Sequence, residues 1–291
     1  MRLTIDMRFN ASPLAEHDGD TVVTIEQLAA LIRSPRQLHG LLRGRRWDAA
    51  RVVRDRRALN GIQAGALGLT GLARTSRFEV VTDEQTTVLG PAAMLARAGA
   101  NFATAFPAEV TRVALARRRA TTTAARDYRL PRRPAGPIRS ITYLRSEPSL
   151  RYLGAHVGGA AAHTAGVING LVNAGVAVHV VAAERPDGIN GAAVTEVPPR
   201  RIFQLVHWPT LIDYSDQQVR AAAAAAPRPD AVYQRYALGS FAGLELARRL
   251  EVPLILEFNG SEIWAERQWG SGNVPFAETL GALERRNVHD A

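Results

Sequence analysis

Polar side chains suited to binding a hydroxyl-rich ligand follow an apolar run that ends near residue 256. Two carboxylates, Glu257 and Glu262, lie within six residues of each other together with the Asn259 amide and the Ser261 hydroxyl. Planar polar groups with an aromatic ring nearby are typical of carbohydrate sites. A simpler interpretation gives the Asn-Gly pair to a turn and makes Ser261 a helix cap. Both interpretations can hold together.

Two other segments carry candidates for binding an anion. Arg235 follows a short apolar run, and a guanidinium there can hold a carboxylate or phosphate in bidentate fashion, although a surface ion pair explains it equally well. Gly158 and Gly159 precede a predicted helix that contains His163. Paired glycines allow the backbone to approach a phosphate, and a helix N-terminus supplies free amides; a tight turn is the alternative.

Other kinds of chemistry lack their usual residues. The chain contains no cysteine, which excludes disulfides and thiolate catalysis and is compatible with a cytoplasmic location. The histidine and carboxylate spacing predicts no metal site, and we expect no cofactor beyond a nucleotide-sugar co-substrate. There is no G-x-S-x-G nucleophile elbow. The N-terminus is too charged for an export signal.

The candidates lie in a segment whose pattern predicts a doubly wound, Rossmann-like parallel sheet. From residue 138 onward, short apolar runs alternate with longer helical segments, and such alternation is typical of α/β proteins. Parallel strands place their C-terminal ends at one edge, so we expect the candidates to meet there. The expected strands are 138–144, 176–182, 201–206, 231–233 and 253–258. The expected helices are 158–174, 215–226 and 240–250, with Gly175 ending the first of them.

A proline-rich segment, 130–137, is predicted to be a linker. Before it, residues 1–129 read as a smaller α/β or α-rich segment of unknown role. We expect strands at 3–9, 49–53 and 77–81, a helix over 61–75, and a long helix over 107–126 that begins at Pro107. Thr24 and Gln27 fit a capping box at the start of another helix.

Basic residues are concentrated in the first part of the chain. Residues 1–137 contain 22 Arg and 12 acidic residues, a net charge of +10, whereas residues 138–291 contain 14 and 15, a net charge of −1. An anionic partner such as a membrane surface fits this charge, and so does a merely solvated arginine-rich face. No nucleic-acid-binding motif is present, so we expect no nucleic-acid partner. A protein peripheral to the inner face of the plasma membrane is therefore one expectation.

Three ordered blocks resemble family 4 glycosyltransferases. They are the glycine pair with its His163 helix and the strand that follows, residues 229–236, and residues 252–262. The resemblance implies the acceptor-side half of a GT-B fold and a retaining transfer of a hexosyl-type sugar from a nucleotide-sugar to a cell-envelope or lipid-linked glycan. Asn259 stands where many members have a catalytic-site histidine, which is a departure from the family pattern.

Taken together, the residues and the resemblance assign three groups of site residues. Catalytic positions are Asn259 and Glu262, and donor diphosphate contacts are Gly158 and Gly159. Acceptor or sugar contacts are His163, Arg235, Glu257 and Ser261.

The glutamate pair of the family's donor domain, eight residues apart, has no counterpart in the chain. We therefore expect residues 138–291 to be a truncated acceptor-side domain that is incomplete for activity on its own. Two alternatives remain open. One is a non-catalytic α/β binding module. The other is a Rossmann-type oxidoreductase, which lacks its G-x-G-x-x-G motif and has only Glu184 as a ribose-binding candidate.

Overall fold

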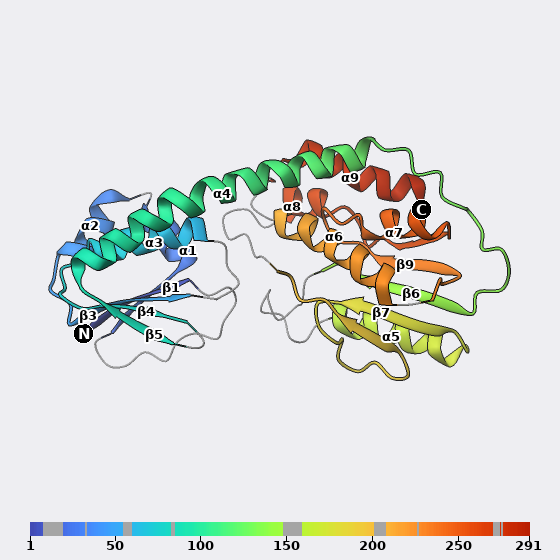
Figure 1. Cartoon of the computed structure of the whole chain (residues 1–291), viewed down its shortest axis with the longest axis horizontal. Coiled ribbons are helices and arrows are strands. Elements are labelled where there is room, and N and C mark those ends of the chain that lie inside the picture. The colour runs from blue at the N-terminus through green and yellow to red at the C-terminus, as the bar shows by residue number, and fades with distance from the viewer. Residues whose placement is uncertain are drawn as a thin grey trace. The chain divides into compact units, whose positions relative to one another are not determined.

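The computed structural model contains two α/β units, Met1–Arg112 and Val113–Ala291, each with its own five-stranded sheet (Figure 1). These largely parallel, helix-flanked sheets confirm the predicted fold class. The structure describes residues 1–7, 20–32, 34–54, 60–82, 85–147, 159–200, 208–225, 227–269, 274 and 276–291. None of the helices within these ranges combines the length and hydropathy that a bilayer-spanning segment needs.

The first unit alternates strands and helices. Its elements are β1 (Arg2–Met7), β2 (Thr21–Thr24), α1 (Ile25–Ile32), α2 (Pro35–Arg43), β3 (Ala49–Arg54), α3 (Asn60–Gly71), β4 (Phe78–Val81), β5 (Thr86–Leu89) and the first part of α4 (Pro91–Ala125). The sheet has the order β2-β1-β3-β4-β5, in which only the β4–β5 pair is antiparallel.

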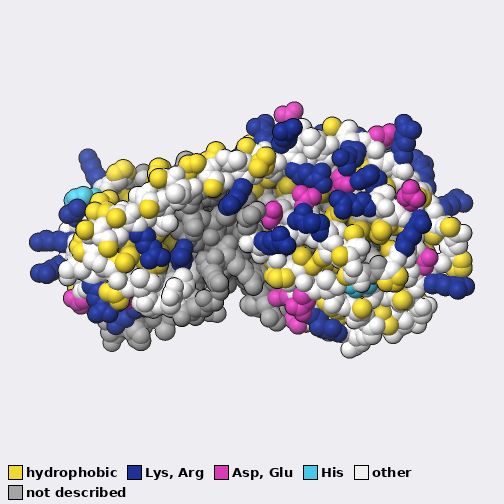
Figure 2. Space-filling view, viewed as in Figure 1, with side chains coloured by type: hydrophobic (Ala, Val, Ile, Leu, Met, Phe, Trp, Pro, Cys, Tyr) yellow, Lys and Arg dark blue, Asp and Glu magenta, His cyan; other side chains and the backbone are white. Residues whose placement is uncertain are grey.

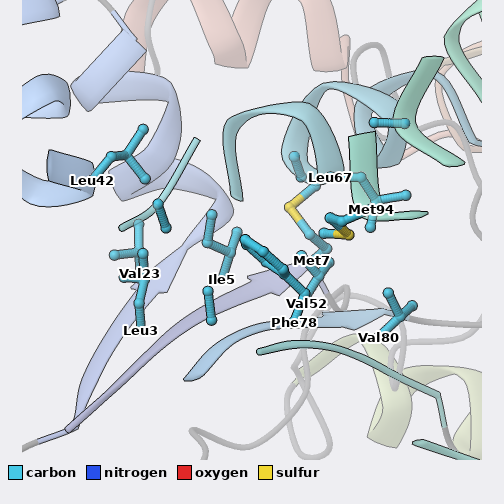
Figure 3. Close-up of a cluster of buried hydrophobic side chains, with 14 of the residues drawn as sticks. Leu3, Ile5, Met7, Val23, Leu42, Val52, Leu67, Phe78, Val80 and Met94 are labelled. Carbon is cyan, nitrogen blue, oxygen red and sulfur yellow. The ribbon is translucent and has the colours of Figure 1, made fainter. Parts of the chain in front are cut away.

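The core of the first unit follows from the alternation of β1. Leu3, Ile5 and Met7 are all fully buried, and they lie on the same face because successive strand residues point to opposite sides. They pack in one hydrophobic cluster with side chains of the neighbouring strands and of α2, α3 and α4 (Figure 3). The helices therefore cover the apolar face of this sheet.

Two helix-start signals in this unit had different outcomes. The capping box is confirmed: the Thr24 amide donates to Gln27 Oε1 at 2.9 Å, and the Gln27 amide donates to Thr24 Oγ1 at 3.4 Å. The prediction that a helix begins at Pro107 is wrong, because α4 begins at Pro91 and continues through Pro107. Residues 91–106 contain seven alanines, whose helix propensity outweighs the lost hydrogen bond at one proline.

The second unit repeats the alternation over a longer stretch. After the end of α4, its elements are β6 (Ser140–Arg145), α5 (Gly159–Asn173), β7 (Ala177–Ala182), β8 (Ala193–Glu196), α6 (Trp208–Ala225), β9 (Ala231–Arg235), α7 (Ala242–Leu250), β10 (Leu254–Glu257), α8 (Glu262–Trp269) and α9 (Ala277–Asp290). The strand predicted over 201–206 lies outside the described residues. As predicted, Gly175 follows α5 with a positive φ of 83°.

The strand order of the second sheet creates a topological switch point. All neighbouring strands are parallel, and the order is β10-β9-β6-β7-β8. The chain therefore proceeds from β6 outward through β7 and β8, then returns to the other side of β6 with β9 and β10. In α/β sheets, ligands bind outside the C-terminal ends of the two strands that flank such a point. Here these strands are β6 and β9.

Helices cover both faces of this sheet (Figure 1). On one face, Tyr143 and Val180 pack with Ile168 of α5. On the other face, Leu144 packs with Val219 of α6 and with α7. Both layers are largely apolar, so most groups available to a ligand lie at the ends of the strands and helices and in the loops.

The division between the two units falls within α4, ahead of the proline-rich segment 130–137. The last part of α4 contributes Ala120 to a core cluster of the second unit. It also brings Arg119 to Asp216 at 3.0 Å and Arg126 to the buried carboxylate of Glu245 at 2.7 Å. Residues 113–129 thus belong structurally with the second unit.

Candidate functional site

The carboxylate of Glu257, the last residue of β10, lies at the centre of a polar cluster. Its Oε1 accepts hydrogen bonds from Asn259 Nδ2 at 2.9 Å, and it lies 3.0 Å from Nε2 of His163 and 3.2 Å from Nη1 of Arg235. Its Oε2 accepts a hydrogen bond from the Tyr233 hydroxyl at 3.1 Å. We call these five residues the Glu257 cluster.

Three elements of the second unit position the Glu257 cluster. Glu257 of β10 and Arg235 of β9 are register partners, so their side chains leave the sheet next to each other. His163 comes from α5, which follows β6. Tyr233 precedes Arg235 by two residues on the same face, and its ring stacks on Tyr143 with the centroids 5.0 Å apart.

The ion pair between Glu257 and Arg235 is buried, whereas His163 and Asn259 are exposed to solvent. The side chains of Glu257 and Arg235 are each only 10% exposed, whereas that of His163 is 51% exposed, and Asn259 is exposed as well. With Nε2 of His163 directed at the carboxylate, its Nδ1 remains available to a ligand. The Nδ1 atom and the Asn259 amide oxygen can therefore receive hydroxyl groups of a ligand.

Ser261 and Glu262 lie outside this cluster, although the sequence placed them in the same site. The Ser261 hydroxyl accepts a hydrogen bond from the Trp264 amide at 3.2 Å, as the capping interpretation predicted for the start of α8. Glu262 Oε1 accepts a hydrogen bond from the Leu238 amide at 2.9 Å. Burial raises the pKa of Glu262 to about 7; the Leu238 hydrogen bond opposes this rise, and the charges of Glu147 and Glu284 add to it.

The predicted phosphate-binding glycines are only partly within the described residues. Gly159 is the first residue of α5, on the segment that follows the C-terminal end of β6, and Gly158 lies outside the described ranges. The described residues contain no group of three or more side chains able to hold a metal ion.

Sequence reasoning missed two residues that bear on the site. The Tyr233 hydroxyl donates a hydrogen bond to Glu257. Strand alternation places Tyr233 on the same side of the sheet as Arg235, so its place near the site could have been predicted from the sequence. Thr164, fully buried, accepts a hydrogen bond from Arg235 Nη1 at 3.5 Å. In the sequence, only its position next to His163 indicated that Thr164 lies near the site.

A doubly wound sheet with a polar cluster beside its switch point is the arrangement in which α/β proteins bind ligands at the C-terminal edge of the sheet. Residues 158–291 match the family described as "Glycosyl transferase 4-like domain". This match supports the resemblance of residues 158–291 to the family 4 glycosyltransferases. In comparisons with curated proteins and with solved structures, nothing matched the chain. The family match favours glycosyl transfer over the oxidoreductase alternative.

Proposed function

We propose that the protein transfers a hexosyl-type sugar from a nucleotide-sugar to a glycan or lipid-linked acceptor of the cell envelope, with retention of the anomeric configuration. The observation that carries this proposal is the Glu257 cluster at the C-terminal edge of a glycosyl transferase 4-like domain. Hydroxyl groups of a sugar require both donors and acceptors of hydrogen bonds, and the Asn259 amide offers both, its oxygen as an acceptor and its second Nδ2 hydrogen as a donor.

Within this proposal, Glu257 is a positioning residue. Its carboxylate neutralises Arg235 inside the molecule and fixes the orientations of His163 and Asn259. The substrate then meets an imidazole and an amide whose rotamers are already set, which lowers the entropy cost of binding. Glu262 supplies a separate carboxyl group that titrates near neutral pH.

The test uses exposed residues, so that loss of function is separable from loss of fold. In a protein that also contains the donor-side domain, His163→Ala and Asn259→Ala should each lower kcat/KM for sugar transfer by roughly tenfold to a hundredfold, because each removes a polar contact to the sugar. The matched control is Glu196→Gln. Glu196 is an exposed carboxylate that ends β8, the opposite edge strand of the same sheet. This control should retain wild-type activity.

Product stereochemistry provides an independent measurement. Proton NMR of the new linkage should show the anomeric configuration of the donor. An inverted product would contradict retention and would instead suit His163 as a base that activates the acceptor hydroxyl. Glycan binding that depends on His163, without transfer from any nucleotide-sugar, would favour the non-catalytic module.

A further inference from the structure

A second feature of the switch point lies next to the Glu257 cluster and is not part of it. Arg145 is the last residue of β6, and its register partner on β9 is Arg235. Both strands that flank the switch point therefore end in an arginine. Arg235 is neutralised by Glu257 at 3.2 Å, whereas Arg145 forms no ion pair within the described part of the chain.

The side chain of Arg145 is buried and incompletely satisfied. The residue is 4% exposed, and neither Nε nor Nη2 has a hydrogen-bond acceptor. A guanidinium is always charged, and burying a charge without a partner is costly, so such groups are normally paired. Nothing within the described residues provides that partner, and an anionic ligand at this position would compensate the charge.

Other polar groups beside Arg145 also favour an oxyanion. Tyr214 of α6 is fully buried, and its hydroxyl lies next to Gln218 but makes no hydrogen bond of good geometry. Burial raises the pKa of this hydroxyl, and the charge of Arg145 opposes that rise, which places the two groups within electrostatic range. The acidic residues near these groups are Glu184, after β7, which also acts on Tyr214, and Glu257, which acts together with Arg145 on Tyr143. The free hydroxyl and guanidinium groups are donors, as an oxyanion requires.

The backbone around Arg145 is held in place. Gln218 of α6 is fully buried, and its Nε2 donates to the Arg145 carbonyl at 2.7 Å and to the Val181 carbonyl at 3.2 Å. This side chain thus clamps the C-terminal ends of β6 and β7 together. Unpaired donors on a rigid frame are preorganised for a ligand, because no reorganisation is needed when it binds.

We propose that the end of β6 is a phosphate-binding site in which Arg145 holds a phosphate group of a substrate. This inference rests on the proposed function for the identity of that substrate. The phosphate can belong to the nucleotide of the donor or to a phosphorylated acceptor, and both offer the same oxygen atoms to the guanidinium.

The experiment compares two arginines at opposite ends of one strand. Arg139 directly precedes β6, is exposed, and uses only its backbone amide to bind Asp230. Arg139→Met is therefore the control for Arg145→Met. Calorimetric titration with pyrophosphate, at constant ionic strength, should show binding to the wild type and to Arg139→Met. The Arg145→Met variant should bind at least about tenfold more weakly, because a charge-assisted hydrogen bond is lost.

A second measurement excludes a purely structural role. Without ligand, Arg145→Met should unfold at the wild-type temperature or above it, since an apolar residue replaces an unpaired buried charge. Arg145→Lys keeps the charge without the bidentate geometry and should bind with intermediate affinity. Absence of pyrophosphate binding by the wild type would overturn the proposal. Equal binding by Arg145→Met, with or without reduced stability, would overturn it as well.

Further ligands identify the source of the phosphate. A nucleoside diphosphate that binds more tightly than pyrophosphate, in an Arg145-dependent manner, assigns the site to the donor. Tighter Arg145-dependent binding of a sugar phosphate assigns it to the acceptor. If pyrophosphate binds as expected and the His163 variants still transfer sugar normally, the role of the Glu257 cluster fails and the phosphate site stands. If sugar transfer depends on His163 as expected but pyrophosphate does not bind, the phosphate site fails and the role of the Glu257 cluster stands.

Discussion

At the scale of single residues, the site combines a neutralised charge with a charge that lacks a partner. Glu257 receives hydrogen bonds or ion pairs from four side chains, so both of its oxygens are occupied and it is held in one position. Arg145, one strand away from Arg235, has no such partner in the described residues. Neighbouring arginines thus differ in their surroundings: Arg235 is neutralised within the protein's own structure, and we propose that Arg145 serves a ligand.

Glu262 should make stability depend on pH near neutrality. Its pKa is raised to about 7, chiefly by burial, so the folded state binds a proton more tightly than the unfolded state does. The free energy of unfolding that this group contributes is fully present at pH values below the ordinary pKa of a carboxyl group, and it is lost as pH rises through about 7. Glu262→Gln removes the titration and should gain stability relative to the wild type between pH 5 and 8. The carboxyl group is enclosed by protein although the residue as a whole is exposed, and solvent screening therefore reduces the size of the gain.

Denaturant unfolding at several pH values measures this difference. Glu278→Gln, an exposed position in the first turn of α9, serves as the control and should preserve the pH dependence of the wild type. A stability difference between Glu262→Gln and wild type that does not change with pH would contradict the raised pKa.

The site residues that could be predicted from the sequence are those at strand ends. His163, Arg235, Glu257 and Asn259 follow or flank apolar runs, and parallel topology brings such positions to one edge. Arg145 ends a strand as well, but neither its burial nor its lack of a partner is visible in a sequence. Ser261 and Glu262 were grouped with the cluster by proximity in sequence, whereas α8 begins between Asn259 and Trp264 and turns them toward other partners.

At the scale of elements, the segments rich in apolar residues could be predicted, and the short strands with few apolar residues could not. Helix α5 and strands β6, β7, β9 and β10 match the expected segments to within a few residues. The four-residue strands β2, β5 and β8 carry too few apolar positions to show a period. Their strand pairing depends on neighbours distant in sequence, which local patterns do not contain.

The packing of α7 on β9 offers a test at this scale. Gly243, in α7, donates its amide to Gln234 Oε1, and a Cβ there would lie 2.8 Å from Leu254 Cδ1 and 2.9 Å from Gln234 Cβ. Gly243→Ala should therefore destabilise the protein by about 2 kcal/mol, because a well-packed interior cannot absorb an added methyl group. Gly170→Ala in α5 has no atom within 4 Å of the new Cβ and should be neutral or stabilising by up to about 1 kcal/mol. Chemical denaturation of the two variants measures both effects, and equal stabilities would contradict the packing described for α7.

At the scale of the whole molecule, the two structural units have nearly equal net positive charges, although the basic residues are concentrated in residues 1–137 of the sequence. The unit Met1–Arg112 contains 15 Arg and 11 acidic residues, a net charge of +4, and Val113–Ala291 contains 21 and 16, a net charge of +5. On the face shown in Figure 2, arginines over the second unit lie among acidic side chains. Arg119, for example, pairs with Asp216 and lies 3.6 Å from Glu245. Part of the basic surface is therefore neutralised within the fold.

Other arginines of the basic segment are exposed, and they carry the last prediction. Arg118, Arg132 and Arg133 form no ion pair within the described residues. We propose that they give the protein a weak attraction to anionic lipid surfaces. Each basic group near such a surface contributes about 1 kcal/mol, and the field decays over a Debye length of roughly 8 Å at physiological salt.

Sedimentation with vesicles that contain phosphatidylserine should therefore show binding at low salt and weaker binding at physiological salt. Replacing Arg118, Arg132 and Arg133 by Gln should reduce the bound fraction, because three unpaired charges are lost. Arg119→Gln, together with Asp216→Asn to avoid an unpaired carboxylate, removes one positive and one negative charge and should change it little. Binding that persists in about 0.5 M salt would contradict an electrostatic attraction, since little of the field survives such screening. Preferential release from vesicles by a nucleic-acid competitor would instead identify nucleic acid as the anionic partner.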